Sequence, residues 1–138
     1  MNRMKILKES TLCQKRYLTI NIIPYISYVT KNGDLYASGK GIGDGSNIPR
    51  KTPILVFQNV IKSAIFKIGY DMRSFLLTSN GELYVLDTKI FRYELLASNV
   101  YLFMEQDVDG FIYFTNNGSV YNFDGKLLFE DLALPKLK

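Results

Sequence analysis

The chain has 138 residues, a mass of 15.8 kDa and a formal net charge of +4. This length fits one domain that buries its own core without disulfides or a structural metal. The composition is 47% hydrophobic and 14% aromatic, with ten Tyr and nine Phe, which excludes a disordered chain and favours β-strands. We therefore expect a single all-β repeat domain over residues 1–138.

The N-terminal stretch MNRMKILKESTLCQK alternates charged and apolar residues, whereas a secretory signal has an unbroken apolar core. No later apolar run approaches the roughly 18 residues of a membrane span. We therefore expect a cytoplasmic protein that does not bind membranes. Cys13 is the only cysteine and the chain has no His to activate it, so we interpret Cys13 as a small buried hydrophobic residue and not as a nucleophile.

A seven-residue pattern, Thr-x-Asn-Gly-x-Leu/Val-Tyr, occurs at residues 30–36, 78–84 and 115–121. Asn-Gly between alternating apolar residues predicts a hairpin with a two-residue type I′ turn, in which both turn residues have positive φ. The tyrosine that ends each pattern is expected to pack between repeats, with its hydroxyl reaching a partner or water. Successive glycines of the pattern are 48 and 37 residues apart, and such periods with β content are typical of propeller blades.

Two further apolar runs precede each hairpin, so each repeat has enough strands for a four-stranded antiparallel blade. The runs are MKILKES and RYLTINII before the first hairpin, PILVF and SAIFKIG before the second, and RYELLAS and VYLFMEQ before the third. We predict blades over residues 4–40, 53–89 and 92–125. Residues 126–134, KLLFEDLAL, are expected to form an extra strand that completes a blade.

The segment ISYVTKNGDLYASGKGIGDGSNIPRKTPILV, residues 26–56, resembles a repeat of the regulator of chromosome condensation family. In that family a hairpin ending in Gly-x-x-Tyr is followed by a glycine-rich loop, a proline and the opening strand of the next unit. Residues 64–87 are less similar to the repeat, and residues 111–124 share only its hairpin pattern. The resemblance implies a β-propeller. It does not imply nucleotide exchange or nucleosome binding, because no residue here matches the founding member's working residues, and the family's Trp-Gly is replaced by Ser38-Gly39.

Three blades do not close a ring, because known propellers have four or more. An isolated arc leaves an apolar sheet face bare at each end, which soluble monomers rarely do. We therefore predict a homodimer in which two copies join head to tail, with twofold symmetry, into a six-bladed ring. The strand in residues 126–134 is expected to cross over and complete the first blade of the partner. The alternative is a compact barrel or sandwich closed within one chain, which would be a monomer.

The most glycine-rich segment is GKGIGDGSN, residues 39–47. It lacks the Lys-Ser/Thr ending of a phosphate-binding loop, and its glycine spacing differs from the dinucleotide-binding pattern. It also follows a hairpin and leads toward a strand, whereas both nucleotide motifs require a strand and then a helix. We interpret it as a connection between blades whose exposed tip binds a protein partner. The candidate partner-binding residues are Gly41, Asp44, Asn47 and Arg50.

Sites for metals and catalysis have weak sequence support. QDVDG, residues 106–110, resembles the start of a calcium loop, but the third acidic position and the distal Glu are missing, so we interpret it as a turn and expect no metal. Without His, acid–base catalysis would depend on Tyr, Lys or paired carboxylates. Asp34, Glu82, Asp87 and Asp124 lie beside turns, where turn geometry accounts for them. We expect no cofactor and no catalytic residues.

The sequence favours a non-catalytic protein-binding module or small inhibitor that acts through propeller loops. One alternative is a nucleic-acid-binding protein, in which Lys62, Lys67, Lys89 and Arg92 converge on one face and binding weakens steeply with salt. A third hypothesis is a carbohydrate-active enzyme, which requires two carboxylates roughly 5 to 10 Å apart in a pocket.

Overall fold

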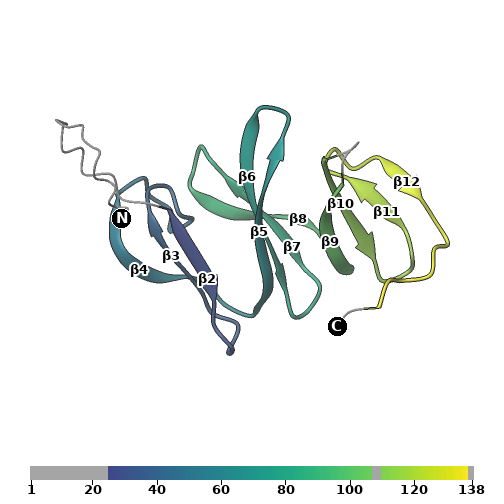
Figure 1. Ribbon diagram of the computed structural model, residues 1–138, viewed down its shortest axis with the longest axis horizontal. Helices are drawn as coiled ribbons and strands as arrows, with labels where there is room; N and C mark the ends of the chain where they lie inside the picture. Colours follow the sequence, from purple (N-terminus) through teal and green to yellow (C-terminus); the bar gives the residue numbers. More distant parts are fainter. Residues whose placement is uncertain (1–24, 107–109, 137–138) are drawn as a thin grey trace, which may run out of the picture.

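The computed structural model describes residues 25–106 and 110–136, and all of the regular elements in this part of the chain are β-strands. They form three antiparallel sheets that stand in a row along the long axis of the molecule (Figure 1). None of the described residues belongs to a helix long and apolar enough to cross a membrane. The prediction of an all-β chain is confirmed.

In every sheet the strand order follows the sequence, so each sheet is an antiparallel meander. The first sheet contains β2 (Ile26–Val29), β3 (Leu35–Gly39) and β4 (Arg50–Phe57). The second contains β5 (Val60–Ile68), β6 (Asp71–Thr78), β7 (Leu83–Asp87) and β8 (Arg92–Ala97). The third contains β9 (Val100–Gln106), β10 (Gly110–Thr115), β11 (Val120–Asn122) and β12 (Leu127–Phe129).

The sheets divide the chain at different points from the predicted units. β4, which contains the PILVF run expected to open the second unit, pairs with β3 in the first sheet. β12 pairs with β11 of its own chain and completes the third sheet, so these residues are not the free strand expected within residues 126–134. The link from β4 to β5 is only Gln58 and Asn59, and Asn59 has a φ of 62°. The predicted strands MKILKES and RYLTINII lie outside the described residues.

The three repeated hairpins are present, but the prediction that they contain type I′ turns is wrong. Only the glycine of each Asn-Gly pair has positive φ, between 83° and 86°, and the asparagine does not. The glycine amide donates to the threonine carbonyl three residues earlier, which defines a type I turn followed by a left-handed glycine. The threonine hydroxyl accepts a hydrogen bond from the amide four residues later. The repeated threonine therefore caps a three-residue loop.

The first and second hairpin turns are each hydrogen-bonded to the start of the following sheet. The Val60 amide donates to the Gly33 carbonyl at 2.8 Å, and the Val100 amide donates to the Gly81 carbonyl at 2.9 Å. A Cβ on either glycine would lie 3.3 Å from the carbonyl oxygen of that valine. Glycine is therefore needed both for the positive φ and for the close approach of the turn to the next sheet.

The second sheet is covered on both faces. Leu76 on β6 packs with Leu35 of the first sheet, whereas its neighbours Phe75 and Leu77 pack against the third sheet. The Phe75 ring stacks on Phe111 of β10, with centroids 4.1 Å apart. Because successive side chains of a strand point to opposite faces, a strand covered on both sides needs a continuous apolar run. The sequence of β6 supplies this run.

The tyrosine that ends each hairpin pattern has a different environment in each sheet. Tyr84 lies between the first and second sheets, with its ring centroid 4.9 Å from that of Phe57. Tyr121 packs against the core between the second and third sheets. Tyr36 lies on the free face of the first sheet, stacked on Tyr28. Within residues 25–106 and 110–136, the row of sheets is therefore open at both ends and is not closed as a barrel or sandwich (Figure 1).

Candidate functional site

The loop between β3 and β4, residues 40–49, is held against the second sheet. The Gly45 amide donates to the Phe91 carbonyl at 2.7 Å. Gly43 lies against Tyr93, since a Cβ at this position would be 2.7 Å from the ring, and its φ is 104°. Only glycine combines this conformation with such a close approach. The loop connects two strands of one sheet, so the prediction that it links successive units is wrong.

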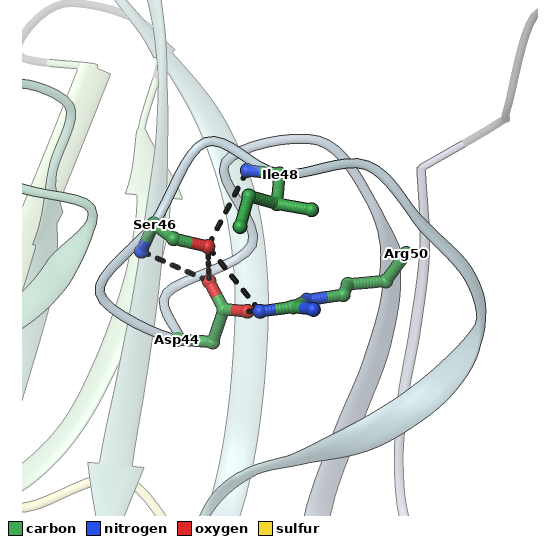
Figure 2. Close-up of polar contacts among 4 residues, drawn as sticks. All are labelled: Asp44, Ser46, Ile48 and Arg50. Atoms are coloured by element: carbon green, nitrogen blue, oxygen red, sulfur yellow. Dashed lines mark hydrogen bonds and ion pairs between the residues drawn. The ribbon is translucent and has the colours of Figure 1, made fainter.

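Asp44 and Arg50 form an ion pair inside this loop (Figure 2). The Nε and Nη2 atoms of Arg50 both lie 2.7 Å from Asp44 Oδ2. The other carboxylate oxygen accepts hydrogen bonds from the amide and the hydroxyl of Ser46, and Ser46 Oγ accepts one from the Ile48 amide. Burial raises the pKa of Asp44, but the hydrogen bonds and charge of its partners outweigh burial and hold this pKa below its ordinary value. The loop is therefore cross-linked by its own side chains at neutral pH.

The four predicted partner-binding residues lie in this one loop but differ in accessibility. Asp44 and Arg50 are bonded to each other. Gly41 lies between Asn47 and Phe91, because a Cβ there would be 3.3 Å from the Asn47 Oδ1 atom and from the Phe91 ring. Asn47 is the one exposed residue of the four. The other three therefore act on the conformation of the loop, and Asn47 lies at its tip.

Ile48 is the most prominent apolar group of the loop, and the sequence analysis did not single it out. It lies between Asn47 and Pro49, with 56% of its surface exposed. An isoleucine within a run of glycine and small polar residues is the signal that could have identified it. Ile90, in the turn between β7 and β8, is also exposed. The bond from Gly45 to Phe91 brings this turn against the loop.

The turn between β5 and β6 lies at the same end of the second sheet as the turn between β7 and β8, because a meander alternates ends. The β5–β6 hairpin extends beyond its sheet, on the side opposite the first Asn-Gly turn (Figure 1). Its tip carries Tyr70, which is 99% exposed. We refer to the loop of residues 40–49, the turn at Tyr70 and the turn at Ile90 as the loop end. Exposed apolar side chains from three connections are thus found at the loop end.

The four basic residues of the nucleic-acid hypothesis do not form one patch. Lys62 and Lys67 lie on β5 and Arg92 lies on β8, the two opposite edge strands of the second sheet, and Lys89 precedes β8. Lys62 and Lys67 are five residues apart, so they point to opposite faces of the sheet. The Lys62 ammonium donates to the Phe103 carbonyl and lies 4.4 Å from the centroid of that ring. Burial lowers the pKa of Lys62.

Acidic groups do not gather in a pocket in the part of the chain that the structure describes. In this part, no group of three or more His, Cys, Asp or Glu residues could hold a metal ion. Asp87 and Glu94, on β7 and β8, share a hydrogen bond that raises the pKa of Glu94. This pair is in direct contact at the surface, whereas the glycosidase hypothesis needs separated carboxylates in a pocket. The acidic residues of the calcium-loop pattern, Asp107 and Asp109, lie outside the described residues.

Two shallow depressions lie at the opposite end, between neighbouring Asn-Gly turns. One, of about 440 Å³, separates the first and second turns, and the other, of about 320 Å³, separates the second and third. Both are lined mainly by backbone and by small polar side chains, and Ile61 contributes to both. Because they recur with the repeat, their presence follows from the spacing of the turns.

Comparison with known proteins gives no match to a family model, to a curated protein or to a solved structure. The resemblance to regulator of chromosome condensation repeats therefore stays a prediction from residues 26–56. The function has to be argued from the geometry of the loop end.

Proposed function

We propose that the chain is a non-catalytic protein-binding module, or a small inhibitor, that binds its partner through the loop end. The observation that carries this proposal is Ile48, an exposed apolar side chain on a loop fixed by the Asp44–Arg50 ion pair. A side chain presented by a rigid loop costs little conformational entropy on binding. Apolar anchors at the centre of an interface contribute most of the binding energy.

We also propose that the three sheets are blades of a propeller, as the repeat period and the family resemblance imply. One three-stranded and two four-stranded meanders, packed face to face, support this interpretation. In a propeller the connections at one end of the blades form a single face. Ile48, Tyr70 and Ile90 would then belong to one binding surface.

A protein partner is favoured over a nucleic acid by the placement of the charges. Nucleic-acid binding needs cations that track the phosphate backbone. Lys62 is bonded to a carbonyl of the third sheet, and Lys67 points to the other face of its strand. The loop end exposes the large apolar side chains of Ile48, Tyr70 and Ile90, which suit a protein surface.

The test is affinity capture from a host lysate on the immobilised 138-residue chain. Ile48→Ser removes the exposed apolar side chain at the loop tip. Ile61→Ser is the matched control, because Ile61 is 59% exposed and lies at the opposite end of the sheet. We expect a protein that the unaltered chain and Ile61→Ser retain but that Ile48→Ser loses. Capture of the same proteins by all three chains would contradict the proposal. So would binding of a mixed oligonucleotide that weakens steeply with added salt.

A further inference from the structure

The third sheet has an outer apolar face that the other described residues cover only in part, because Ile112 and Val120 on this face are buried whereas Met104 and Phe129 are exposed. Phe111 and Tyr113 of β10 face the second sheet, so Phe114 points the other way. Met104 and Phe129 lie on this same outer face, through the pairing of β9, β10, β11 and β12. We call Met104, Phe114 and Phe129 the last end face.

The first sheet has a corresponding face at the other end of the row. Val29 and Leu35 pack toward the second sheet, so Tyr28 and Tyr36 point away from it, and Leu55 pairs with Tyr36 on this side. We call Tyr28, Tyr36 and Leu55 the first end face. Tyr28 is 47% exposed. Apolar sheet faces that the described residues leave partly uncovered at both ends are unusual for a soluble monomer.

The interface between the first and second sheets shows what the last end face is built to receive. Phe57 ends the first sheet and is covered by Tyr84 of the second, at 4.9 Å between ring centroids. Phe129 is the equivalent of Phe57 in the third sheet. Each phenylalanine pairs with the residue just before the repeated tyrosine, and a β-bulge follows that residue. Phe129 is 60% exposed, and the residue with the place of Tyr84 in the first sheet is Tyr36.

The same correspondence extends to the backbone. Leu132 donates its amide to the Gly118 carbonyl at 3.0 Å, as Val60 and Val100 do to the glycines of the earlier turns. Those valines begin β5 and β9, the first strands of the second and third sheets. Each of these strands pairs with the strand that leads into the hairpin of its own sheet, β6 or β10. Residues 132–135 therefore have the place at which a following sheet would start, and Tyr101 fixes them by donating its hydroxyl to the Pro135 carbonyl at 2.7 Å.

We propose that a second copy of this chain docks its first end face on the last end face, with Tyr28 and Tyr36 covering Phe129. β2 of the incoming copy then lies beside residues 132–135. A twofold pair makes this contact twice, so that six sheets close with no free apolar face. The proposal concerns the ends of the row and does not depend on partner binding at the loop end.

The test is the molar mass in solution, by light scattering on a sizing column, of single variants and of their mixture. We expect about twice 15.8 kDa for the unaltered chain, and the single-chain mass for Phe129→Asp and for Tyr28→Lys. Mixing these two variants should restore the doubled mass. One junction of the mixed pair then joins an unaltered first end face to an unaltered last end face, and the other joins Lys at position 28 to Asp at position 129. Tyr70→Lys, at the hairpin tip, is the control and keeps the doubled mass.

Far-ultraviolet circular dichroism establishes that each variant is folded before its mass is compared. An unaltered chain with the single-chain mass at every concentration would overturn the proposal, and would point to residues 1–24 of the same copy as the cover of the first end face. A pair that Phe129→Asp disrupts but Tyr28→Lys does not would also overturn it, because that result describes contact between two last end faces.

Discussion

The second and third sheets contain the same hairpin pattern, yet the face of each sheet that points away from the first sheet has different surroundings. In the second sheet, Phe75 and Leu77 lie in a core that the third sheet covers, and both are buried. In the third sheet, Phe129 and Met104 lie on the last end face and are exposed. A single copy thus completes two interfaces between sheets, and in our proposal it presents the two halves of a third. The repeat therefore determines which side chains form the faces of a sheet, and the position of the sheet in the row determines how far each face is covered.

The largest expected effect separates these two sheets by truncating one phenylalanine in each. Phe75→Ala should lower the free energy of unfolding by about 3–5 kcal/mol, because Phe75 is fully buried and its removal leaves a cavity. Phe129→Ala should cost less than about 1 kcal/mol in a single copy, because an exposed side chain leaves no cavity.

Urea denaturation measures both values, in a background of Tyr28→Lys that keeps copies apart. Equal losses for the two variants would show that the last end face is already covered within one copy. That result would remove the contrast between the second and third sheets.

A second prediction compares two glycines of the third sheet with the same φ of 85°. Gly118→Ala places its methyl group against the Leu132 carbonyl, whereas Gly125→Ala meets nothing within 4 Å. We expect Gly125→Ala to cost about 1 kcal/mol from backbone strain alone. Gly118→Ala should cost about 1–2 kcal/mol more, since the backbone contact to Leu132 has to move. Denaturant midpoints test this, and equal costs would mean that residues 132–135 do not dock on the turn.

A third prediction concerns the loop of residues 40–49, which connects β3 to β4 and packs against the second sheet. Asp44→Asn should lower the free energy of unfolding by about 1 kcal/mol or less at neutral pH, because it removes one ion pair. The pKa of Asp44 lies below its ordinary value of 3.8, so the carboxylate stabilises the fold above this pH and loses its contribution as the pH falls through the lowered pKa.

The difference in stability between the unaltered chain and Asp44→Asn should therefore shrink on acidification below about pH 4. Thermal melts at several pH values measure this difference. A gap that widens in acid would contradict the assignment of Asp44 as an ionised partner of Arg50.

The smallest expected effect on stability is at the loop tip. Ile48→Ser should change the free energy of unfolding by less than about 0.5 kcal/mol, because Ile48 is exposed and anchors no core. Its effect should be confined to partner binding. A large loss of stability, measured by urea denaturation, would mean that Ile48 packs on the scaffold and is not a free contact.

Local features of the fold could be predicted from the sequence, and pairings across long connections could not. The three hairpins were predictable because Asn-Gly and the flanking apolar alternation act within a few residues. The turn type was missed because the Thr30 hydroxyl accepts a hydrogen bond from the Asp34 amide, four residues later, and this bond stabilises a longer loop. The partner of β4 was missed because ten residues of glycine-rich loop separate it from β3, with no local signal for its sheet.

The candidate site shows the same limit. The loop of residues 40–49 was predictable from its glycines, but the pairing of Asp44 with Arg50 depends on a loop conformation that only the contact with Tyr93 and Phe91 defines. Whether Ile48 is buried or exposed also depends on that conformation. The sequence therefore predicted the loop but not which of its side chains are accessible.

The most direct test of the central claim, that the two end faces are open in one copy and cover each other in two, is amide hydrogen exchange at low and high protein concentration. We expect amides of β6 to exchange slowly at both concentrations, because the first and third sheets cover the second sheet in every copy. Amides of β2 and of residues 132–134 should become markedly more protected as the concentration rises. Protection of β2 and residues 132–134 that does not change with concentration, in a chain of constant single-copy mass, would contradict the account.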